Sequence, residues 1–391
     1  MKLLPLIGVL AQLVPGLWFT PEPTIREGLT EGDAICLGIP VGKLPAGTFV
    51  QFGISLENLG DKAPRHYMVE VNEGGGWRCI SEPVFNDGLS DYSFVTAPQE
   101  YRHPSTYQEI FRLRKPVRDS LRVRCRVCSP YAADRTLLDA SSPGNSVELK
   151  ARSYVGARLQ PLGNKAPGKR FKVLLVGNSF TYFYGEPLIL QELAFSQGIG
   201  LDISSSLKGG QTFRDHAGLP LSLAALSAEE YDFAFLQGQS QESALFALDP
   251  AGMRDVKTAL CQLCDALRAT SPSCRVFVEN TWAYEGAEYG GFGSMERFDA
   301  LLADGCRTLA TVSRSEVSPV GQAFAAARAA GAPEGLYDTD SKHPGLAGAY
   351  LKACVTCLVI SGRPFKGAVP ACGLPEEEAS ALRKIAETIV L

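Results

Sequence analysis

The 391-residue sequence lacks a strong charge imbalance and has no long basic run. Its formal net charge is −4, with acidic and basic side chains interspersed along the chain. Because proteins that bind nucleic acids usually carry a basic patch or stripe, we expect no nucleic-acid partner. Hydrophobic residues make up 45% of the chain, which is enough to build a sizeable core.

Long apolar runs are also missing, except near the N-terminus. Pro5 and Pro15 interrupt that stretch, so we expect no membrane-spanning helix there or elsewhere. Residues 1–19 have a short charged start and an apolar centre, and are predicted to be a signal peptide, although no small-x-small cleavage site follows. The protein would then be periplasmic or secreted. If the stretch is instead part of the mature protein, we expect a cytoplasmic location.

The sequence has eleven cysteines, an odd number, so at least one has no partner within the chain. Three pairs have C-x-x-C spacing: Cys125/Cys128, Cys261/Cys264 and Cys354/Cys357. The pairs are far apart in the sequence and have no histidines beside them, which argues against a zinc site. We interpret them as small buried residues and expect no metal. So many free thiols are more typical of a reducing compartment, and the disulfide pattern is not predicted.

Two regions of the chain have different patterns. Residues 20–150 contain short, often alternating apolar segments between Gly, Pro, Asn and Asp clusters, which predicts an all-β sandwich or jelly-roll domain. Residues 151–170 contain many structure breakers and are predicted to be a linker. In residues 171–391, strands and helices alternate, which indicates a parallel sheet covered by helices. Strands are expected at 171–176, 201–206, 231–236, 274–279 and 314–318. Helices are expected between and after them, around 186–197, 217–228, 250–270, 294–313 and 320–330, and near 345–361 and 375–390.

Residues 171–181 read FKVLLVGNSFT and draw attention to Ser179. The apolar run Val173 to Val176 suits a strand buried on both faces. It leads into a sharp turn, Gly177-Asn178-Ser179, before a helical pattern begins. Open α/β sheets bind their ligands at this carboxyl edge, which makes Ser179 a candidate nucleophile. The alternative is that Ser179 only caps a helix.

Polar clusters follow the other predicted strands as well. They are Gly209–Thr212, Gly238–Ser240 and Asn280–Trp282, and Asp340–His343 lies farther along the chain. Such a group could carry out acyl transfer, because a serine nucleophile needs a nearby base and histidine titrates near neutral pH. An aspartate three residues before the histidine could orient its ring. Gly210 and Gln239 could donate hydrogen bonds to an oxyanion.

The order of these clusters resembles the motif blocks of the SGNH hydrolase superfamily, also called GDSL-like esterases. The resemblance covers about residues 171–365. It implies a three-layer, flavodoxin-like α/β/α domain with a five-stranded parallel sheet and a catalytic triad of Ser179, His343 and Asp340. It also implies an oxyanion hole from Ser179, Gly210 and Gln239, and no cofactor. The third block normally supplies asparagine, so either Gln239 or Gln237 would take that role. No G-x-S-x-G motif supports an α/β-hydrolase.

The leading hypothesis from the sequence is a serine esterase that removes an acetyl or other short acyl group, with a carbohydrate as the acylated partner. Candidate substrate-binding residues are Asn178, Gln237, His216, Trp282 and Tyr284. The alternatives are a lipid or thioester acyl hydrolase, and a degenerate hydrolase that binds a glycan without cleaving it. The sequence does not predict the oligomeric state.

Overall fold

The computed structural model describes residues 27–29, 34–56, 67–80, 105–127, 147–148, 155–207, 209–285, 291–331 and 333–391. The chain divides into two compact units, Met1–Ala166 and Pro167–Leu391, and each unit is described here by itself. The predicted signal peptide, residues 1–19, lies outside the described residues, so the location of the protein stays a prediction. Among the helices of the described ranges, none is long and apolar enough to cross a membrane.

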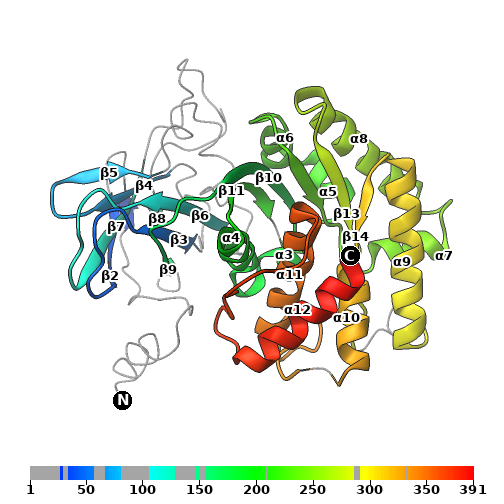
Figure 1. The fold of residues 1–391 in the computed structure, drawn as a ribbon. Helices are drawn as coiled ribbons and strands as arrows, with labels where there is room; N and C mark the ends of the chain where they lie inside the picture. Colours follow the sequence, from blue (N-terminus) through cyan, green and yellow to red (C-terminus); the bar gives the residue numbers. More distant parts are fainter. Residues whose placement is uncertain are drawn as a thin grey trace. The chain divides into compact units, whose positions relative to one another are not determined.

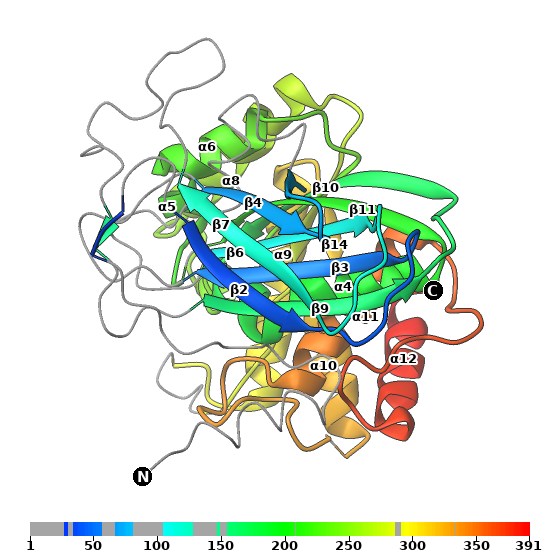
Figure 2. The same ribbon diagram turned by 90° about the vertical axis from the view of Figure 1, so that its left-hand side faces the viewer.

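The first unit is built from antiparallel strands (Figure 2). Strands β2, β7, β4 and β5 form one sheet in that order, β6, β3 and β9 form a second, and β1 pairs with β8. The strands are β1 Glu27–Leu29, β2 Ala34–Pro40, β3 Phe49–Leu56, β4 Tyr67–Asn72, β5 Trp77–Cys79, β6 Ser105–Arg112, β7 Ser120–Val127, β8 Val147–Glu148 and β9 Val155–Gly163. The antiparallel sheets agree with the predicted β-rich domain.

Side chains at the start of β7 alternate between the core and solvent, as the pleat of a strand requires, whereas three consecutive residues of β3, including Gln51, are buried. Val50 and Phe52 are fully buried on β3, and Leu121 and Val123 are fully buried on β7. The prediction of a linker over 151–170 was wrong in its first part, because β9 lies there and pairs with β3. The structure breakers that suggested a linker gather at and after the end of β9.

The second unit contains a five-stranded parallel sheet (Figure 1). Its strands are β10 Lys169–Gly177, β11 Ile199–Leu207, β12 Phe233–Leu236, β13 Arg275–Glu279 and β14 Glu316–Ser318. They lie in the order β11-β10-β12-β13-β14. The chain adds β11 on one side of β10 and then adds β12, β13 and β14 in succession on the other side. This order confirms the predicted flavodoxin-like sheet and places a switch point between β10 and β12.

Helices cover both faces of this sheet. They are α3 Ser179–Tyr182, the 3-10 helix η2 Phe183–Gly185, α4 Glu186–Ser196, α5 Phe213–Gly218, α6 Pro220–Ser227, α7 Glu242–Leu248, α8 Arg254–Thr270, α9 Met295–Val312, α10 Val320–Ala329, α11 Leu346–Ser361 and α12 Glu376–Val390. Val173 and Leu175 of β10 pack in the core with α4, α10 and α11. Leu174 and Val176 pack in a second core with α6 and α8. The sheet is therefore the middle of three layers, as predicted.

Two local features differ from the expected helices. A single helix was expected at 217–228, but the chain forms α5 and α6, with a break at Leu219 and Pro220 at the start of α6. Proline has no N–H to continue a helix and suits the first helical position. The short helix α7 was not expected, and it begins at the buried residue Glu242.

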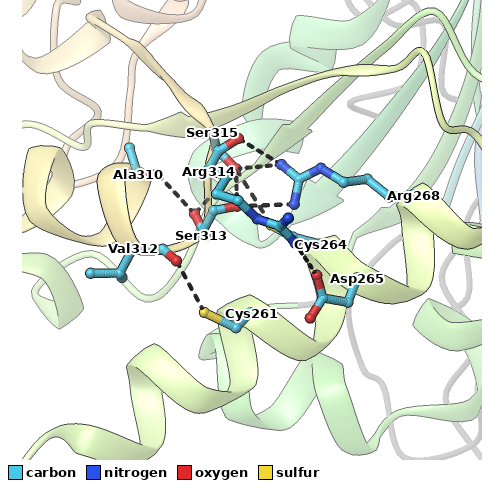
Figure 3. Close-up of polar contacts among 9 residues, drawn as sticks. All are labelled: Cys261, Cys264, Asp265, Arg268, Ala310, Val312, Ser313, Arg314 and Ser315. Carbon is cyan, nitrogen blue, oxygen red and sulfur yellow. Dashed lines mark hydrogen bonds and ion pairs between the residues drawn. The ribbon is translucent and has the colours of Figure 1, made fainter.

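The turn between α9 and β14 is fixed by side chains of α8 (Figure 3). Arg268 donates hydrogen bonds to the carbonyls of Ser313 (3.0 Å) and Arg314 (2.7 Å), which lie just past the end of α9. The Cys264 thiol lies 3.5 Å from the Ser315 hydroxyl, and Cys261 contacts the Val312 carbonyl at 3.7 Å. This C-x-x-C pair thus packs against a turn.

The structure describes the burial of only one of the two other C-x-x-C pairs. Cys354 and Cys357 are both fully buried in α11, as expected of small core residues. The side chains of Cys125 and Cys128 lie outside the described part of the structure. Across the described ranges, no three His, Cys, Asp or Glu side chains gather as a metal site would require.

Candidate active site

The turn after β10 positions Ser179 at the carboxyl edge of the sheet. Asn178 is the N-cap of α3, and its side-chain oxygen accepts a hydrogen bond from the Phe180 N–H at 3.1 Å. The cap therefore belongs to Asn178, and the hydroxyl of Ser179 is left for other partners. Ser179 is half-buried, so it is reachable from solvent.

Ser179, His343 and Asp340 converge. The Ser179 Oγ lies 2.8 Å from His343 Nε2, and His343 Nδ1 lies 2.5 Å from Asp340 Oδ2. The other Asp340 oxygen accepts from the backbone N–H groups of Lys342 (3.0 Å) and His343 (2.9 Å). Partial burial raises the pKa of Asp340, but the bonds from His343 and the backbone outweigh it and lower this pKa overall. The carboxylate thus stays ionised and orients the imidazole.

Aromatic rings fix the histidine and its loop. Phe183 stacks on the His343 ring at 4.3 Å between centroids, and Phe180 meets the ring edge-on at 5.4 Å. Trp282 stacks between Phe180 (4.4 Å) and Phe324 (4.1 Å). Its indole N–H donates to the Lys342 carbonyl at 3.1 Å. Trp282 therefore joins the segment that carries the serine to the loop that carries the histidine.

Candidate oxyanion donors lie in three segments. Within the described ranges, the backbone N–H groups of Ser179 and Gly210 have no protein acceptor. Gly210 has a φ of +73°, a conformation that favours glycine. The Gln239 amide is half-buried, and its NH₂ group donates to the Ser240 hydroxyl at 3.1 Å, which leaves a second N–H. These groups have the chemistry that an oxyanion hole requires.

Asn178 and Gln237 hold these segments in place. The Asn178 NH₂ donates to the carbonyls of Gln211 and Gly238, both at 3.0 Å. The Gln237 side-chain oxygen accepts from the Asn178 N–H (3.1 Å) and the Thr181 hydroxyl (3.0 Å), while its NH₂ donates to the Gly238 carbonyl. Both the oxygen and the nitrogen of the Gln237 carboxamide are thus already hydrogen-bonded within the protein. Of the two glutamines considered for the third block, Gln239 is therefore the better candidate for an oxyanion donor.

Glu242 forms a second tie between the same segments. Its carboxylate accepts hydrogen bonds from the N–H groups of Phe213 (3.1 and 3.2 Å) and Gln239 (3.0 Å). Burial raises the pKa of Glu242 to about 7, against the lowering effect of these bonds.

A buried ion pair contacts the short helix α3, which begins at Ser179. Lys352 Nζ donates to Glu279 Oε2 at 2.6 Å and to the Thr181 hydroxyl at 2.9 Å, and both charged side chains are buried. Glu186, also buried, has no hydrogen-bond partner for either carboxyl oxygen among the described residues. Burial raises the pKa of Glu186 to about 8, although the charge of Lys352 opposes this rise.

No protein-family model and no curated protein matches the chain. Among solved structures, it is similar to a DUF4886 family protein from Bacteroides uniformis, at 20% identity and a TM-score of 0.47, with 56% of this chain and 94% of that chain covered. A candidate SGNH hydrolase from Slackia heliotrinireducens is 24% identical, with a TM-score of 0.40 and 49% and 99% covered. A variant of an acetyl xylan esterase from Geobacillus stearothermophilus is 14% identical, with a TM-score of 0.39 and 52% and 99% covered.

In motif order, residues 171–365 resemble the SGNH hydrolase superfamily. The four polar clusters that carry this resemblance come together at one edge of the sheet. Asn178 and Glu242 tie the second and third blocks to each other, and Asn178 precedes the serine of the first.

The residues that were predicted to contact substrate are placed differently from the prediction. All five are buried, with exposed fractions of 0–4%: Asn178, His216, Gln237, Trp282 and Tyr284. The His216 ring bridges the Ser222 hydroxyl (2.8 Å) and the Gly177 carbonyl (3.1 Å) inside the core. We therefore correct their role to support of the site, because side chains so buried offer no surface to a substrate.

Other residues at this SGNH-like site were missed from the sequence. Phe183 and Tyr184 lie four and five residues after Ser179, and Tyr184 is 41% exposed, with a φ of +53°. Its hydroxyl donates to Asp338 at 3.1 Å. Glu242 and Lys352 were also missed. Each carried a visible signal, because Glu242 follows Gln239 by three residues and Lys352 is the one charged residue in the apolar stretch 346–360.

Proposed function

We propose that this protein is a serine ester hydrolase that uses Ser179, His343 and Asp340. The observation that supports it most is the unbroken hydrogen-bond relay from Ser179 Oγ through the His343 ring to Asp340, with distances of 2.8 and 2.5 Å. The nucleophile, the base and the group that orients the base are thus within reach of one another.

In the proposed reaction, Ser179 Oγ attacks the ester carbonyl carbon while its proton passes to His343 Nε2. The negative charge on the carbonyl oxygen is stabilised by the N–H groups of Ser179 and Gly210 and by the Gln239 amide. The tetrahedral intermediate collapses as His343 gives its proton to the departing alcohol. Water then attacks the acyl-enzyme with His343 as base, which releases the acid and restores Ser179. The chemistry needs only water as co-reactant.

For the substrate, we propose a short acyl ester on a carbohydrate. Tyr184 supports this choice, because its exposed ring lies next to Phe183, which stacks on the catalytic histidine. Exposed aromatic rings give sugar rings an apolar face to stack on. A lipid or thioester substrate would use the same relay. A glycan-binding protein without activity is disfavoured by the intact relay.

The nucleophile can be tested directly. Ser179→Ala should abolish hydrolysis of p-nitrophenyl acetate and labelling by a fluorophosphonate, with little change in the melting temperature. Ser196→Ala serves as a matched control, since Ser196 bonds only near the end of α4, to the Leu193 carbonyl and to Gln197. Hydrolysis or labelling that survives in Ser179→Ala would refute the proposed function.

The carbohydrate can be tested separately through Tyr184. Tyr184→Ala should raise KM for an acetylated oligosaccharide about tenfold, while kcat/KM for p-nitrophenyl acetate changes little. A tenfold loss corresponds to about 1.4 kcal/mol, near the upper end of the roughly 0.5–1.5 kcal/mol of one aromatic contact. An equal effect on both substrates would contradict a role in sugar binding.

A further inference from the structure

Glu242 is a buried carboxylate, 3% exposed, at the first residue of α7. The acyl-transfer steps do not use it, yet it contacts two of the three segments that carry oxyanion donors. One segment is the start of α5, three residues after Gly210, where the Phe213 N–H donates to the carboxylate. The other is the turn after β12, where the N–H of Gln239 donates at 3.0 Å.

The carboxylate lies so close to the backbone of Gly238 that a larger residue at this position would displace the carboxylate or the Phe213 ring. A Cβ on Gly238 would lie 2.2 Å from Glu242 Oε2 and 2.8 Å from the Phe213 ring, which no real Cβ tolerates. Asn178 bonds the carbonyls of the same two segments. The two loops are thus held together by Glu242, which accepts hydrogen bonds from both, and by Asn178, which donates hydrogen bonds to both.

Only an ionised carboxylate suits this position. Its two oxygens face N–H donors, and a proton on either oxygen would point at a donor and remove an acceptor. Among the described residues, the charged group that acts on Glu242 is Asp215 of α5, whose side chain is held in a capping box with Thr212. Burial, reinforced by Asp215, raises the pKa of Glu242 to about 7, within the range where enzymes work.

We propose that Glu242 is a positioning residue of the oxyanion hole, whose ionised side chain holds Gly210 and Gln239 at the spacing that a developing oxyanion needs. This inference rests on the proposed function. Protonation of Glu242 releases the two segments from each other and weakens the stabilisation of the transition state. Substrate binding is affected little, because Glu242 itself does not reach the substrate.

This role gives the activity a second ionisation on its acidic side. In the wild-type protein, the protonation of Glu242 adds one ionisation to the acidic limb, so log kcat/KM against pH should fall more steeply at low pH, by about one unit of slope, than in a variant that cannot ionise at this position. In Glu242→Gln this ionisation is absent, so the acidic slope should be smaller by about 1 than in wild type. The kcat of this variant should fall 10- to 1000-fold, as when an oxyanion donor is lost, with KM nearly unchanged.

The experiment compares wild type, Glu242→Gln, Glu242→Asp and the control Asp232→Asn. Asp232 accepts a backbone N–H from Lys172 at the opposite end of β12, so its variant should keep the kcat and pH profile of wild type. Glu242→Asp keeps the charge, and should lower kcat but retain the steep acidic limb. It also serves if Glu242→Gln does not fold.

Amide hydrogen exchange provides a readout that does not depend on activity. The amides of Phe213 and Gln239 should exchange at least tenfold faster in Glu242→Gln than in wild type. Unchanged exchange, or an unchanged acidic slope in an active variant, would overturn the inference. If the wild-type protein hydrolyses no ester, the proposed function fails by itself, and the amide exchange still decides whether Glu242 holds the two segments.

Discussion

Glu186 should make the stability of the α/β unit depend on pH. The side chain begins α4, is fully buried, and has no partner for its carboxyl oxygens among the described residues. The change to test is Glu186→Gln, which keeps the shape of the side chain but cannot ionise. We expect the variant to be more stable than wild type above neutral pH.

The size of the effect follows from the pKa of Glu186. Burial raises it from the ordinary value of 4.5 to about 8. Between these values, the folded protein holds a proton that the unfolded chain has lost, so stability falls as pH rises. Each pH unit in this window costs about 1.4 kcal/mol, so the accumulated cost at pH 8 is about 5 kcal/mol. Below pH 4.5, the group is neutral in both states and the cost vanishes.

The assay is equilibrium urea unfolding of both proteins at pH 4.5, 6 and 8, followed by tryptophan fluorescence, to which buried Trp282 contributes. The difference in unfolding free energy between variant and wild type should grow from near zero at pH 4.5 to roughly 4–5 kcal/mol at pH 8. Groups other than Glu186 cancel in this difference. A difference that stays constant across the three pH values would refute the reasoning.

Three further predictions concern the supports of the site. Asp340→Asn should lower kcat about 100- to 10,000-fold without unfolding the protein, because the imidazole loses the carboxylate that orients it. Steady-state kinetics at pH 7 measure this loss, and a decrease of less than tenfold would contradict the prediction. Trp282→Phe leaves the Lys342 carbonyl without its hydrogen-bond donor. It should lower the free energy of unfolding, measured by thermal unfolding, by about 1–3 kcal/mol and should also lower kcat. Lys352→Met leaves Glu279 buried without a cation and should lower the free energy of unfolding by about 3–5 kcal/mol. The double variant with Glu279→Gln should recover most of this stability.

The sequence predicted the framework of the α/β unit because its signals are local. The run Val173 to Val176 could be read as a strand buried on both faces, and the structure buries it so. The carboxyl ends of parallel strands share one edge, so the polar clusters after them could be expected to meet. Asp340 and His343 follow no strand, so this argument does not place them, and their pairing with Ser179 was expected from the resemblance to the SGNH motif blocks.

The direction of side chains in the loops could not be predicted in the same way. Trp282 and Tyr284 follow the end of β13, where the alternation of a strand no longer tells inside from outside, and both proved to be buried. Glu242 and Lys352 lie on helices, and each has a partner far away in the sequence, the backbone N–H of Phe213 for Glu242 and the carboxylate of Glu279 for Lys352. Such contacts depend on tertiary packing. In the first unit, β9 was missed because its neighbouring glycines and prolines dominated the pattern.

The aromatic stack of Phe180, Trp282 and Phe324 has a consequence for redesign. Because it connects the serine segment with the histidine loop, the two motifs are not independent parts that could be transferred to another scaffold separately. A graft that carried Ser179 and the loop of His343, but replaced Trp282, would keep the reactive groups and lose their alignment. Libraries that reshape substrate preference should therefore vary exposed positions such as Tyr184 and leave the stack intact.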